Sequence, residues 1–328
     1  MQSRKTSADL WHQKPYYSLD AWCKNTYGRK LYKAALDIGC TCPNRDGTLD
    51  TRGCIFCSAG GSGDFAASRQ LSVTDQLNQA KALLSSKWTP EPGKPSLIAY
   101  FQAYTNTYGD PDRLLSYYEE ALSSPEVAGI SIATRPDCLS DIILEGLDRL
   151  RLLYPDRFIW IELGLQSIHD HTAARIRRGY PTSVFYDAAA KLHARRLPFI
   201  VHLILGLPGE TRLDLLESIR AVNQVHPFGV KLPLLHILKG TDLALLYEAG
   251  KLPVLTQEEY LDLLTSCIAA LSPDICLHRV TGDGPRKLLI APQWSLSKRN
   301  VLNGLHALMK QRNLRQGDNY EPGTSYTL

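Results

Sequence analysis

The 328-residue sequence lacks any long apolar run: the longest, FIVHLILGLP, is far shorter than the roughly 18 to 20 residues needed to span a bilayer. We therefore expect no membrane partner and interpret this run as a buried strand. The amino-terminal segment MQSRKTSADLWHQKPYY also lacks the apolar middle of a secretory signal. We accordingly expect a cytoplasmic protein, in a reducing compartment where disulfides are rare.

The sequence also lacks a strong charge imbalance, since 37 Lys and Arg against 33 Asp and Glu give a formal net charge of +4. A charge of this size does not by itself indicate a polyanionic partner. Basic residues do cluster locally, at Arg175, Arg177, Arg178, Arg195, Arg196, Arg286, Lys287, Lys298, Arg299, Lys310, Arg312 and Arg315. Each cluster taken alone is typical of a solvated helix face, and there is no low-complexity tract or short repeat.

What the sequence does contain is an alternation of apolar, β-branched runs with helix-forming segments, the pattern of βα units and a parallel sheet. We predict strands at 30–38, 97–103, 128–134, 158–165, 199–206 and 229–238, and helices at 112–124, 138–153 and 214–222. Six strands in this order predict an α/β fold, a partial (β/α)6 TIM-like barrel. Residues 1–29 are expected to lead into a core barrel at 30–245, and residues 246–328 to form a C-terminal extension with a strand at 275–282.

Four of the eight cysteines lie in one short segment, CTCPNRDGTLDTRGCIFC, at positions 40, 42, 54 and 57. Two close pairs are compatible with a structural zinc ion, but Cys40 and Cys42 would point to opposite sides of an extended backbone. The alternative uses Cys42, Cys54 and Cys57, on the loop after the first strand, as three ligands of an iron–sulfur cluster with one open iron. Cys40 is then a buried residue at the strand end.

Several further segments follow the cysteines in a fixed order: AYFQAYTNT, ATRPDCL, ELGLQS, HLILGLPGE, HILKGT, HRVTGDGP and APQW. With CPNRDGT and RGCIFCSAGGSGDF they resemble the radical S-adenosylmethionine (radical SAM) enzymes, in the branch that contains the Elongator protein 3, MiaB and YhcC proteins. They are most similar to the YtqA group, also called MnmL. The common superfamily spacing is C-x3-C-x2-C, whereas the first gap here is longer, as is typical of this branch.

The resemblance implies a radical SAM barrel in which Cys42, Cys54 and Cys57 hold a 4Fe-4S cluster and the open iron chelates S-adenosylmethionine (SAM). Nearby glycines in SAGGSGDF would let backbone approach the cluster or cofactor. The SAM-binding residues that the resemblance implies are Gln102, Thr134, Arg135, Glu162, Gln166, Gly206 and Glu210, with Thr105 and Asn106 just past Gln102.

Simpler interpretations of three of these positions stay open. The guanidinium of Arg135 suits a carboxylate, but its neighbour Asp137 has the residue type of a helix cap. Glu162 lies in an apolar run and needs a buried partner, which is either the cofactor or a structural ion pair. Glu210 precedes a predicted helix and is suited to cap it.

The resemblance further implies substrate-side residues, which are His236, Lys239, His278, Arg279, Asp283 and Trp294. It implies work on transfer RNA (tRNA), in which the carboxymethylaminomethyl group of the wobble uridine becomes aminomethyl, with an electron donor such as flavodoxin or ferredoxin. Basic surface residues fit such a partner because phosphate contacts supply most of the sequence-independent affinity. A radical SAM enzyme for a small molecule or protein, and a non-catalytic zinc or RNA-binding module, are the alternatives.

Overall fold

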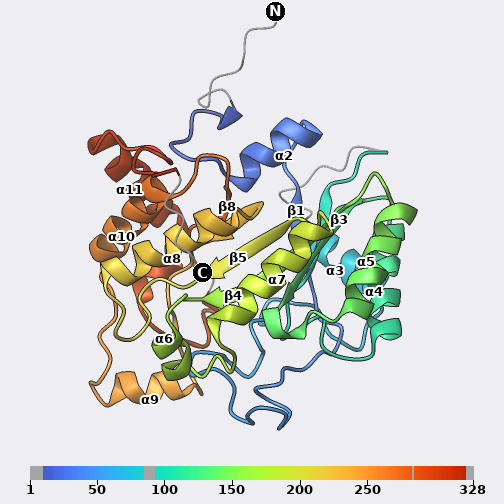
Figure 1. Cartoon of the computed structure of the whole chain (residues 1–328), viewed down its shortest axis with the longest axis horizontal. Helices are drawn as coiled ribbons and strands as arrows, with labels where there is room; N and C mark the ends of the chain where they lie inside the picture. Colours follow the sequence, from blue (N-terminus) through green and yellow to red (C-terminus); the bar gives the residue numbers. More distant parts are fainter. Residues whose placement is uncertain (1–9, 85–92, 283, 323–328) are drawn as a thin grey trace, which may run out of the picture. The chain divides into compact units, whose positions relative to one another are not determined.

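The fold is that of a computed structural model, which describes residues 10–84, 93–282 and 284–322 (Figure 1). Asp283, one of the predicted substrate-side residues, lies outside the described residues. Within the described ranges, no helix combines the length and the apolar character that crossing a membrane requires.

The chain divides into two compact units, each built from discontinuous segments. The first, here called the cysteine unit, comprises Arg29–Gly164 and Ser183–Phe199. The second, here called the C-terminal unit, comprises Met1–Gly28, Leu165–Thr182 and Ile200–Leu328. The chain therefore passes between the units near the end of the fourth strand and returns before the fifth.

Parallel strands form the sheet of the cysteine unit, where each neighbours the next along the chain. They are β1 (Tyr32–Leu36), β2 (Leu97–Phe101), β3 (Val127–Thr134) and β4 (Phe158–Gln166), the last two residues of β4 belonging to the C-terminal unit. Seven of the eight β3 residues are buried, which is typical of a parallel strand covered on both faces. Four of the predicted strands are confirmed here.

Helices follow the strands of this unit, and α3 packs against β1 while α4 packs against β3. They are α3 (Val73–Leu84), α4 (Pro111–Ser123), the short 3-10 turn η1 (Pro136–Cys138), α5 (Asp141–Leu153) and α7 (Thr182–Ala194). Figure 1 shows α4 and α5 side by side, and the absence of a side chain at Gly146 permits this, since a Cβ there would lie 2.3 Å from Leu115 Cδ1. The helix predicted to begin at 138 begins at Asp141 because the Ser140 side chain caps it.

In the C-terminal unit, β5 (Phe199–Leu203), β6 (Gly229–Lys231) and β8 (Cys276–Arg279) are parallel neighbours. The predicted strand 229–238 is wrong as a single element, because the chain breaks after β6 near Pro233, which has no N–H to donate. Its end forms β7 (Ile237–Leu238), which pairs antiparallel with β9 (Leu289–Ala291). Since β8 comes from the predicted extension, the count of six barrel strands was one too small.

The helices of this unit include α8 and α10, which both begin with a capping box, at Thr211 and Thr256. They are α2 (Leu19–Tyr27), α6 (Asp170–Arg175), α8 (Arg212–Val225), α9 (Asp242–Glu248), α10 (Gln257–Ala270), the 3-10 turn η2 (Gln293–Leu296) and α11 (Lys298–Gln311). The N–H of Leu277 in β8 donates to the Tyr17 carbonyl at 2.8 Å. The predicted N-terminal lead-in therefore packs against the C-terminal unit.

Arg178 anchors the segment between β4 and α7, although its cluster was interpreted as a solvated helix face. Its side chain is only 1% exposed, so that interpretation is wrong for this residue. The guanidinium donates to the Leu165 carbonyl at 2.9 Å, the Ser167 carbonyl at 2.6 Å and the Thr182 hydroxyl at 2.9 Å. Arg178 thus serves the fold, because five donors in a rigid fork can satisfy several loop carbonyls at once.

Replacing this arginine is expected to destabilise the protein strongly. Arg178→Met keeps much of the volume but leaves buried carbonyls without a donor, so the free energy of unfolding should fall by about 3 kcal/mol or more, measured by urea denaturation. Arg175→Met is the matched control, because Arg175 is exposed and should cost less than about 1 kcal/mol. Equal losses in the two variants would contradict the anchoring role.

Candidate functional site

Cys42, Cys54 and Cys57 lie on the irregular loop that follows β1 in the cysteine unit. Arg45 fixes this loop, since its Nη2 donates to the carbonyls of Cys57 at 2.7 Å and Ser58 at 3.0 Å. The Cys57 N–H also donates to the Cys54 carbonyl at 3.0 Å. One side chain in the loop therefore orders the backbone that carries the cysteines.

The thiols of this loop are close enough to affect one another's ionisation. Burial raises the pKa of Cys54 to about 12, and the neighbouring Cys57 and Cys42 act in the same direction. Burial likewise raises the pKa of Cys57, against the lowering effect of Arg45. These thiols hold their protons at neutral pH unless a bound cation displaces them, and thiolates are the form that ligates metals.

Cys40 is buried, as predicted, and its surroundings differ from those of the other three cysteines. Burial and then Asp37 raise its pKa to about 12, and it contributes to the raised pKa of Tyr118 on α4. A tetrahedral zinc site, with Zn–S bonds of about 2.3 Å, needs its four sulfurs within about 4 Å of one another. No cysteine belongs to a group of three possible ligands within 4.8 Å in the described ranges, so this geometry does not favour zinc.

Arg135, at the carboxyl end of β3, points toward the cysteine loop. Its Nη1 lies 3.9 Å from Cys42 Sγ, and the rest of the guanidinium makes a bidentate pair with Asp137, at 2.9 and 2.7 Å. The helix-cap interpretation of Asp137 is wrong, because Ser140 caps α5 and Asp137 is committed to Arg135. The pairing with Asp137 holds the positive charge of Arg135 beside Cys42, a candidate metal ligand.

The segment after β2 connects the loops of its neighbours. The Thr105 N–H donates to the Thr41 carbonyl at 3.1 Å, and the Asn106 N–H donates to the Ala133 carbonyl at 3.0 Å. Asn106 is fully buried and its Oδ1 has no hydrogen-bond partner in the described part of the chain. A buried acceptor without a donor is costly, so this atom fits a ligand that supplies an N–H or O–H.

The other predicted residues after β2 and β3 are held by protein contacts. Gln102 is half-buried at the end of β2, and its N–H donates to the Leu36 carbonyl at 3.3 Å. The hydroxyl of Thr134 lies 2.5 Å from that of Thr107, which in turn donates to the Cys138 carbonyl. Thr134 thus ties its strand end to the segment after β2.

The glycines of SAGGSGDF were expected to let backbone approach the cluster or cofactor, but the close approaches seen are to protein. A Cβ at Gly61 would lie 2.4 Å from the Tyr104 ring, and one at Gly63 would lie 2.6 Å from Ala103 Cβ. These glycines pack the cysteine loop onto the segment after β2, which brings both segments to one edge of the sheet.

Glu162 makes a buried ion pair within the cysteine unit. Its Oε1 accepts from Lys33 Nζ at 2.9 Å and from the Ser131 hydroxyl at 2.6 Å, and its side chain is 0% exposed. The structure therefore contains the ion pair that was the alternative to cofactor binding at this position.

Three predicted SAM-binding residues belong to the C-terminal unit. Gln166 has a φ of 63° and Gly206 a φ of 86°, and such a φ is strained for a residue with a side chain, as at Gln166. Glu210 accepts a short hydrogen bond from the Ser167 hydroxyl, and burial raises its pKa. The cap of α8 is made by Thr211 and Asp214, so Glu210 does not cap that helix.

The C-terminal unit brings some of the predicted substrate-side residues together. His236 Nε2 lies 3.1 Å from the hydroxyl of Ser295, the residue after Trp294, and Arg279 influences the ionisation of His236. The Trp294 ring packs 5.6 Å from that of Tyr260. Lys239 follows β7 and is exposed. His278, on β8, packs its ring 5.3 Å from Phe228.

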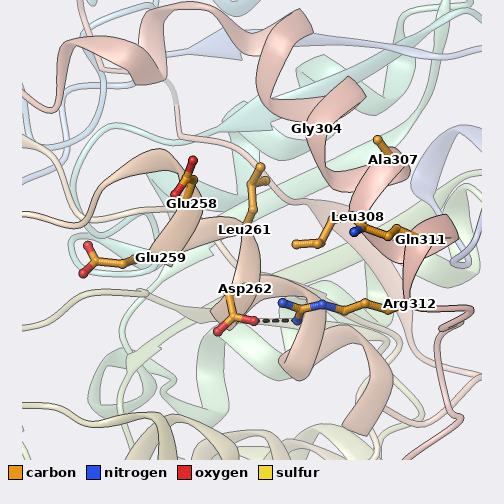
Figure 2. A pocket seen from close by; sticks show the side chains of 9 residues that line it. All are labelled: Glu258, Glu259, Leu261, Asp262, Gly304, Ala307, Leu308, Gln311 and Arg312. Atoms are coloured by element: carbon orange, nitrogen blue, oxygen red, sulfur yellow. Dashed lines mark hydrogen bonds and ion pairs between the residues drawn. The ribbon is translucent and has the colours of Figure 1, made fainter.

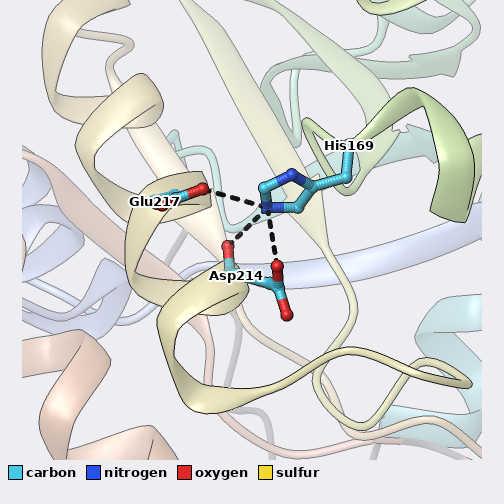
Figure 3. Close-up of side chains that lie close together, drawn as sticks. All are labelled: His169, Asp214 and Glu217. Atoms are coloured by element: carbon cyan, nitrogen blue, oxygen red, sulfur yellow. Dashed lines mark hydrogen bonds and ion pairs between the residues drawn. The ribbon is translucent and has the colours of Figure 1, made fainter.

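A second group of possible metal ligands lies at the start of α8, where His169, Asp214 and Glu217 have ligand atoms within 4.8 Å of one another (Figure 3). His169 Nε2 is 3.0 Å from the Asp214 carbonyl oxygen, and Asp214 Oδ2 accepts from Thr211. These contacts account for the group as part of the helix start, whose positive dipole end disfavours a further cation.

A groove of about 480 Å³ lies between α10 and α11 (Figure 2). Glu258, Glu259 and Asp262 lie along it, and Asp262 pairs with Arg312. Hydrogen bonds from Arg212, and then Arg312, hold the pKa of Asp262 below its usual value. The acidic lining does not suit nucleic-acid phosphates.

Sequence reasoning missed Lys33, Arg45 and Cys138. Cys138 lies on η1 near Arg135 and Cys42, and burial raises its pKa to about 12, but its distance along the chain hid this placement. A lysine in the otherwise apolar strand YKAAL was a signal for Lys33, because an isolated buried charge needs a partner. Arg45 carried no signal beyond its place between two cysteines.

Comparison with protein families gives two matches. Residues 42–222 match the family described as the Radical SAM superfamily, and residues 227–311 match its C-terminal domain. The uncharacterized protein YtqA of Bacillus subtilis is 40% identical over 305 residues, covering 93% of this chain and 92% of that one. Protein YhcC of Escherichia coli is 36% identical, covering 82% and 84% of the two chains.

Among solved structures, the archaeal Methanocaldococcus infernus Elp3 with an N-terminal deletion superposes with a TM-score of 0.62 at 17% identity. The match covers 75% of this chain, which spans only 61% of the length of that one. This likeness concerns the fold alone, and it confirms the predicted α/β class of a partial TIM-like barrel.

The buried His236 predicts a pH dependence of stability. Burial, and then Arg279, lower its pKa from 6.5 to about 4. Below pH 6.5 His236 becomes protonated in the unfolded chain, whereas in the folded chain it stays neutral until the pH falls to about 4. Stability is therefore full above pH 6.5 and is lost as the pH falls, by about 2 kcal/mol between pH 7 and pH 5. In urea denaturation, the free energy of unfolding of His236→Gln should fall by about 2 kcal/mol less than that of wild type over this interval. If the free energies of the two proteins fell in parallel with pH, His236 would not be the source of the pH dependence.

Proposed function

Because this chain belongs to the radical SAM superfamily, we propose that Cys42, Cys54 and Cys57 ligate a 4Fe-4S cluster whose fourth iron binds SAM. These cofactors are the ones that this enzyme family uses. The observation that carries the ligand choice is the mutual effect of the three thiols on one loop, while Cys40 faces Asp37 and Tyr118. Soft thiolates suit such a cluster, and three ligands leave one iron open.

We propose that SAM is bound by the residues at the strand ends. The proposed set is Gln102, Thr134, Arg135, Gln166, Gly206 and Glu210. Glu162, which the resemblance also implied, is left out because its carboxylate is held by Lys33 and Ser131. To it we add Asn106, because its buried Oδ1 is an acceptor in need of a donor. Arg135 places a positive charge next to Cys42, with its Nη1 3.9 Å from the sulfur.

The proposed substrate is tRNA, and the basic residues of the C-terminal domain support it. Arg286, Lys287, Lys298 and Arg299 are all exposed. Lys298 and Arg299 occupy the first turn of α11, where the helix dipole favours acidic residues and where the structure has none. These charges therefore do not serve helix stability, and they suit phosphate contacts.

We propose that the enzyme converts carboxymethylaminomethyl-uridine at the wobble position into aminomethyl-uridine. Bound SAM, with an electron from a donor such as flavodoxin or ferredoxin, would supply a radical that takes a hydrogen atom from the substrate. The carboxymethyl carbon would lose that hydrogen atom and then an electron and a proton, which would leave a carbon–nitrogen double bond. Water adds to this bond and releases the aminomethyl nucleoside and glyoxylate. The electron lost by the substrate balances the one used to cleave SAM.

In this proposal the protein works in the cytoplasm, with a core barrel at 30–245. His236, Lys239, His278, Arg279 and Trp294 are proposed to face the substrate. Of these, His236 lies within hydrogen-bonding distance of Ser295, the residue after Trp294, and Arg279 influences the ionisation of His236.

The ligand choice predicts which cysteines the cluster needs. After anaerobic reconstitution, Cys42→Ala, Cys54→Ala and Cys57→Ala should each lose most bound iron and sulfide, because each removes a ligand thiolate. Cys40→Ala is the matched control and should keep the iron content and visible absorbance of wild type. Zinc without colour, lost in all four variants, would instead indicate a structural site.

The substrate proposal is tested with anaerobic enzyme, reductant, SAM and tRNA that carries the carboxymethylaminomethyl group. Nucleoside mass spectrometry should show aminomethyl-uridine, with one glyoxylate for each conversion. An unchanged profile, with SAM still cleaved, would reject tRNA and favour a small-molecule or protein substrate.

The double variant Lys287→Glu/Arg299→Glu should bind tRNA about tenfold or more weakly and lower the salt dependence, while SAM cleavage without tRNA is unchanged. Arg220→Glu, a single charge reversal on the exposed face of α8, is the control and should leave the affinity for tRNA unchanged.

A further inference from the structure

We propose that Lys33 binds the carboxylate of the substrate, and that Glu162 and Ser131 position its ammonium group. This inference rests on the proposed function and assigns a residue to substrate recognition in it. Lys33 lies on β1, in the strand that the cysteine loop follows.

The contact between Lys33 and Glu162 shows that the inner faces of the four strands converge. Lys33 is on β1 and Glu162 on β4, and β2 and β3 lie between them. Three strand spacings amount to about 14 Å in a flat sheet. Nζ and Oε1 are nevertheless 2.9 Å apart, so the sheet of this unit curls and the two side chains meet across its concave face.

Each of the four strands supplies one side chain to this cluster. Tyr100 of β2 places its ring centroid 4.3 Å from Lys33 Nζ, and Ser131 of β3 donates to Glu162 at 2.6 Å. The ring face attracts the ammonium, and the serine helps to orient the carboxylate. The Glu162 carboxylate and the Tyr100 ring thus fix the orientation of the Lys33 ammonium group.

Lys33 has donor capacity left over, whereas Glu162 is hidden. An ammonium group carries three N–H donors, and the one hydrogen bond of Lys33 in the described residues goes to Glu162. The lysine side chain is 25% exposed and the glutamate side chain 0% exposed. A ligand entering the concave face therefore meets the ammonium and not the carboxylate.

Stability alone does not explain the pair. Buried ion pairs commonly contribute no more to stability than well-packed apolar residues would, because both charges lose their hydration. A charged pair in an otherwise apolar strand therefore calls for another role, and an oriented cation open to the interior suits an anion.

The depth of Lys33 favours the carboxylate of the substrate over that of SAM. Lys33 is the second residue of β1, three residues before the strand ends at Leu36, or about 10 Å at 3.3 Å per residue. In the proposed site the SAM carboxylate would be held at the cysteine loop, beyond that end. The carboxylate of the substrate arm adjoins the carbon that loses hydrogen, so holding it fixes the reacting atom.

The test compares tRNA carrying the carboxymethylaminomethyl group with tRNA carrying the aminomethyl group, which lacks the carboxylate. Wild type should bind the first about 10- to 100-fold more tightly, the range expected for a charge-assisted hydrogen bond. Lys33→Met should abolish this preference and lower kcat/KM by a similar factor, mainly through KM. Cluster content and the Kd for SAM should stay unchanged.

Two further variants distinguish a loss of substrate recognition from misfolding. Lys33→Met/Glu162→Gln also neutralises the buried carboxylate that loses its lysine in the single variant, and should fold yet still lack the preference. Lys30→Met is the matched control, because Lys30 is exposed, lies just before the same strand and makes a similar cation–π contact, 4.8 Å from the Tyr32 ring centroid. It should retain the wild-type preference.

The outcomes separate the claims. A weaker Kd for SAM and loss of deoxyadenosine in the Lys33 variants would assign the lysine to the SAM carboxylate and overturn the inference. An unchanged preference in the folded double variant would make the pair purely structural, which also overturns it. Wild type that cleaves SAM but yields no aminomethyl-uridine would remove the proposed function itself, and this inference with it.

Discussion

The hydrogen bonds that join the loops after β1, β2 and β3 hold the candidate site together. Thr105 donates to Thr41, Asn106 donates to Ala133, and Arg135 reaches Cys42. Parallel strands make this possible, because their carboxyl ends meet at one edge of a sheet. The cysteine loop has little regular structure of its own, so its shape depends on these contacts and on Arg45.

Arg178 and Glu162 are buried charged residues, and each has several partners. Arg178 satisfies the carbonyls of an irregular segment, and Glu162 accepts from a lysine and a serine. Both were difficult to interpret from sequence for the same reason. An arginine among basic neighbours and a glutamate among apolar ones look the same whether their partner is solvent, a ligand or a distant part of the chain.

The thiols show the opposite situation, since burial raises their pKa values and no basic residue fully offsets it. A protein that only had to pack would gain nothing from two such groups in one loop, Cys54 and Cys57. The binding of a polyvalent metal centre would offset the cost of ionising them, and in the proposed function it would couple the order of the loop to the cofactor. Arg135 and Arg45 reduce that cost by placing positive charge nearby.

By itself the sequence determined the α/β class and most strand positions, because hydrophobic periodicity is a local property. The choice of three cysteines stays a prediction. The sequence left undecided the break at Pro233, the seventh strand β8 and the partners of Arg178, Glu162 and Asp137. Only the tertiary structure decided these, since each depends on residues far apart in the chain. Lys33 and Glu162 are 129 positions apart, and only a curled sheet brings them within hydrogen-bonding distance.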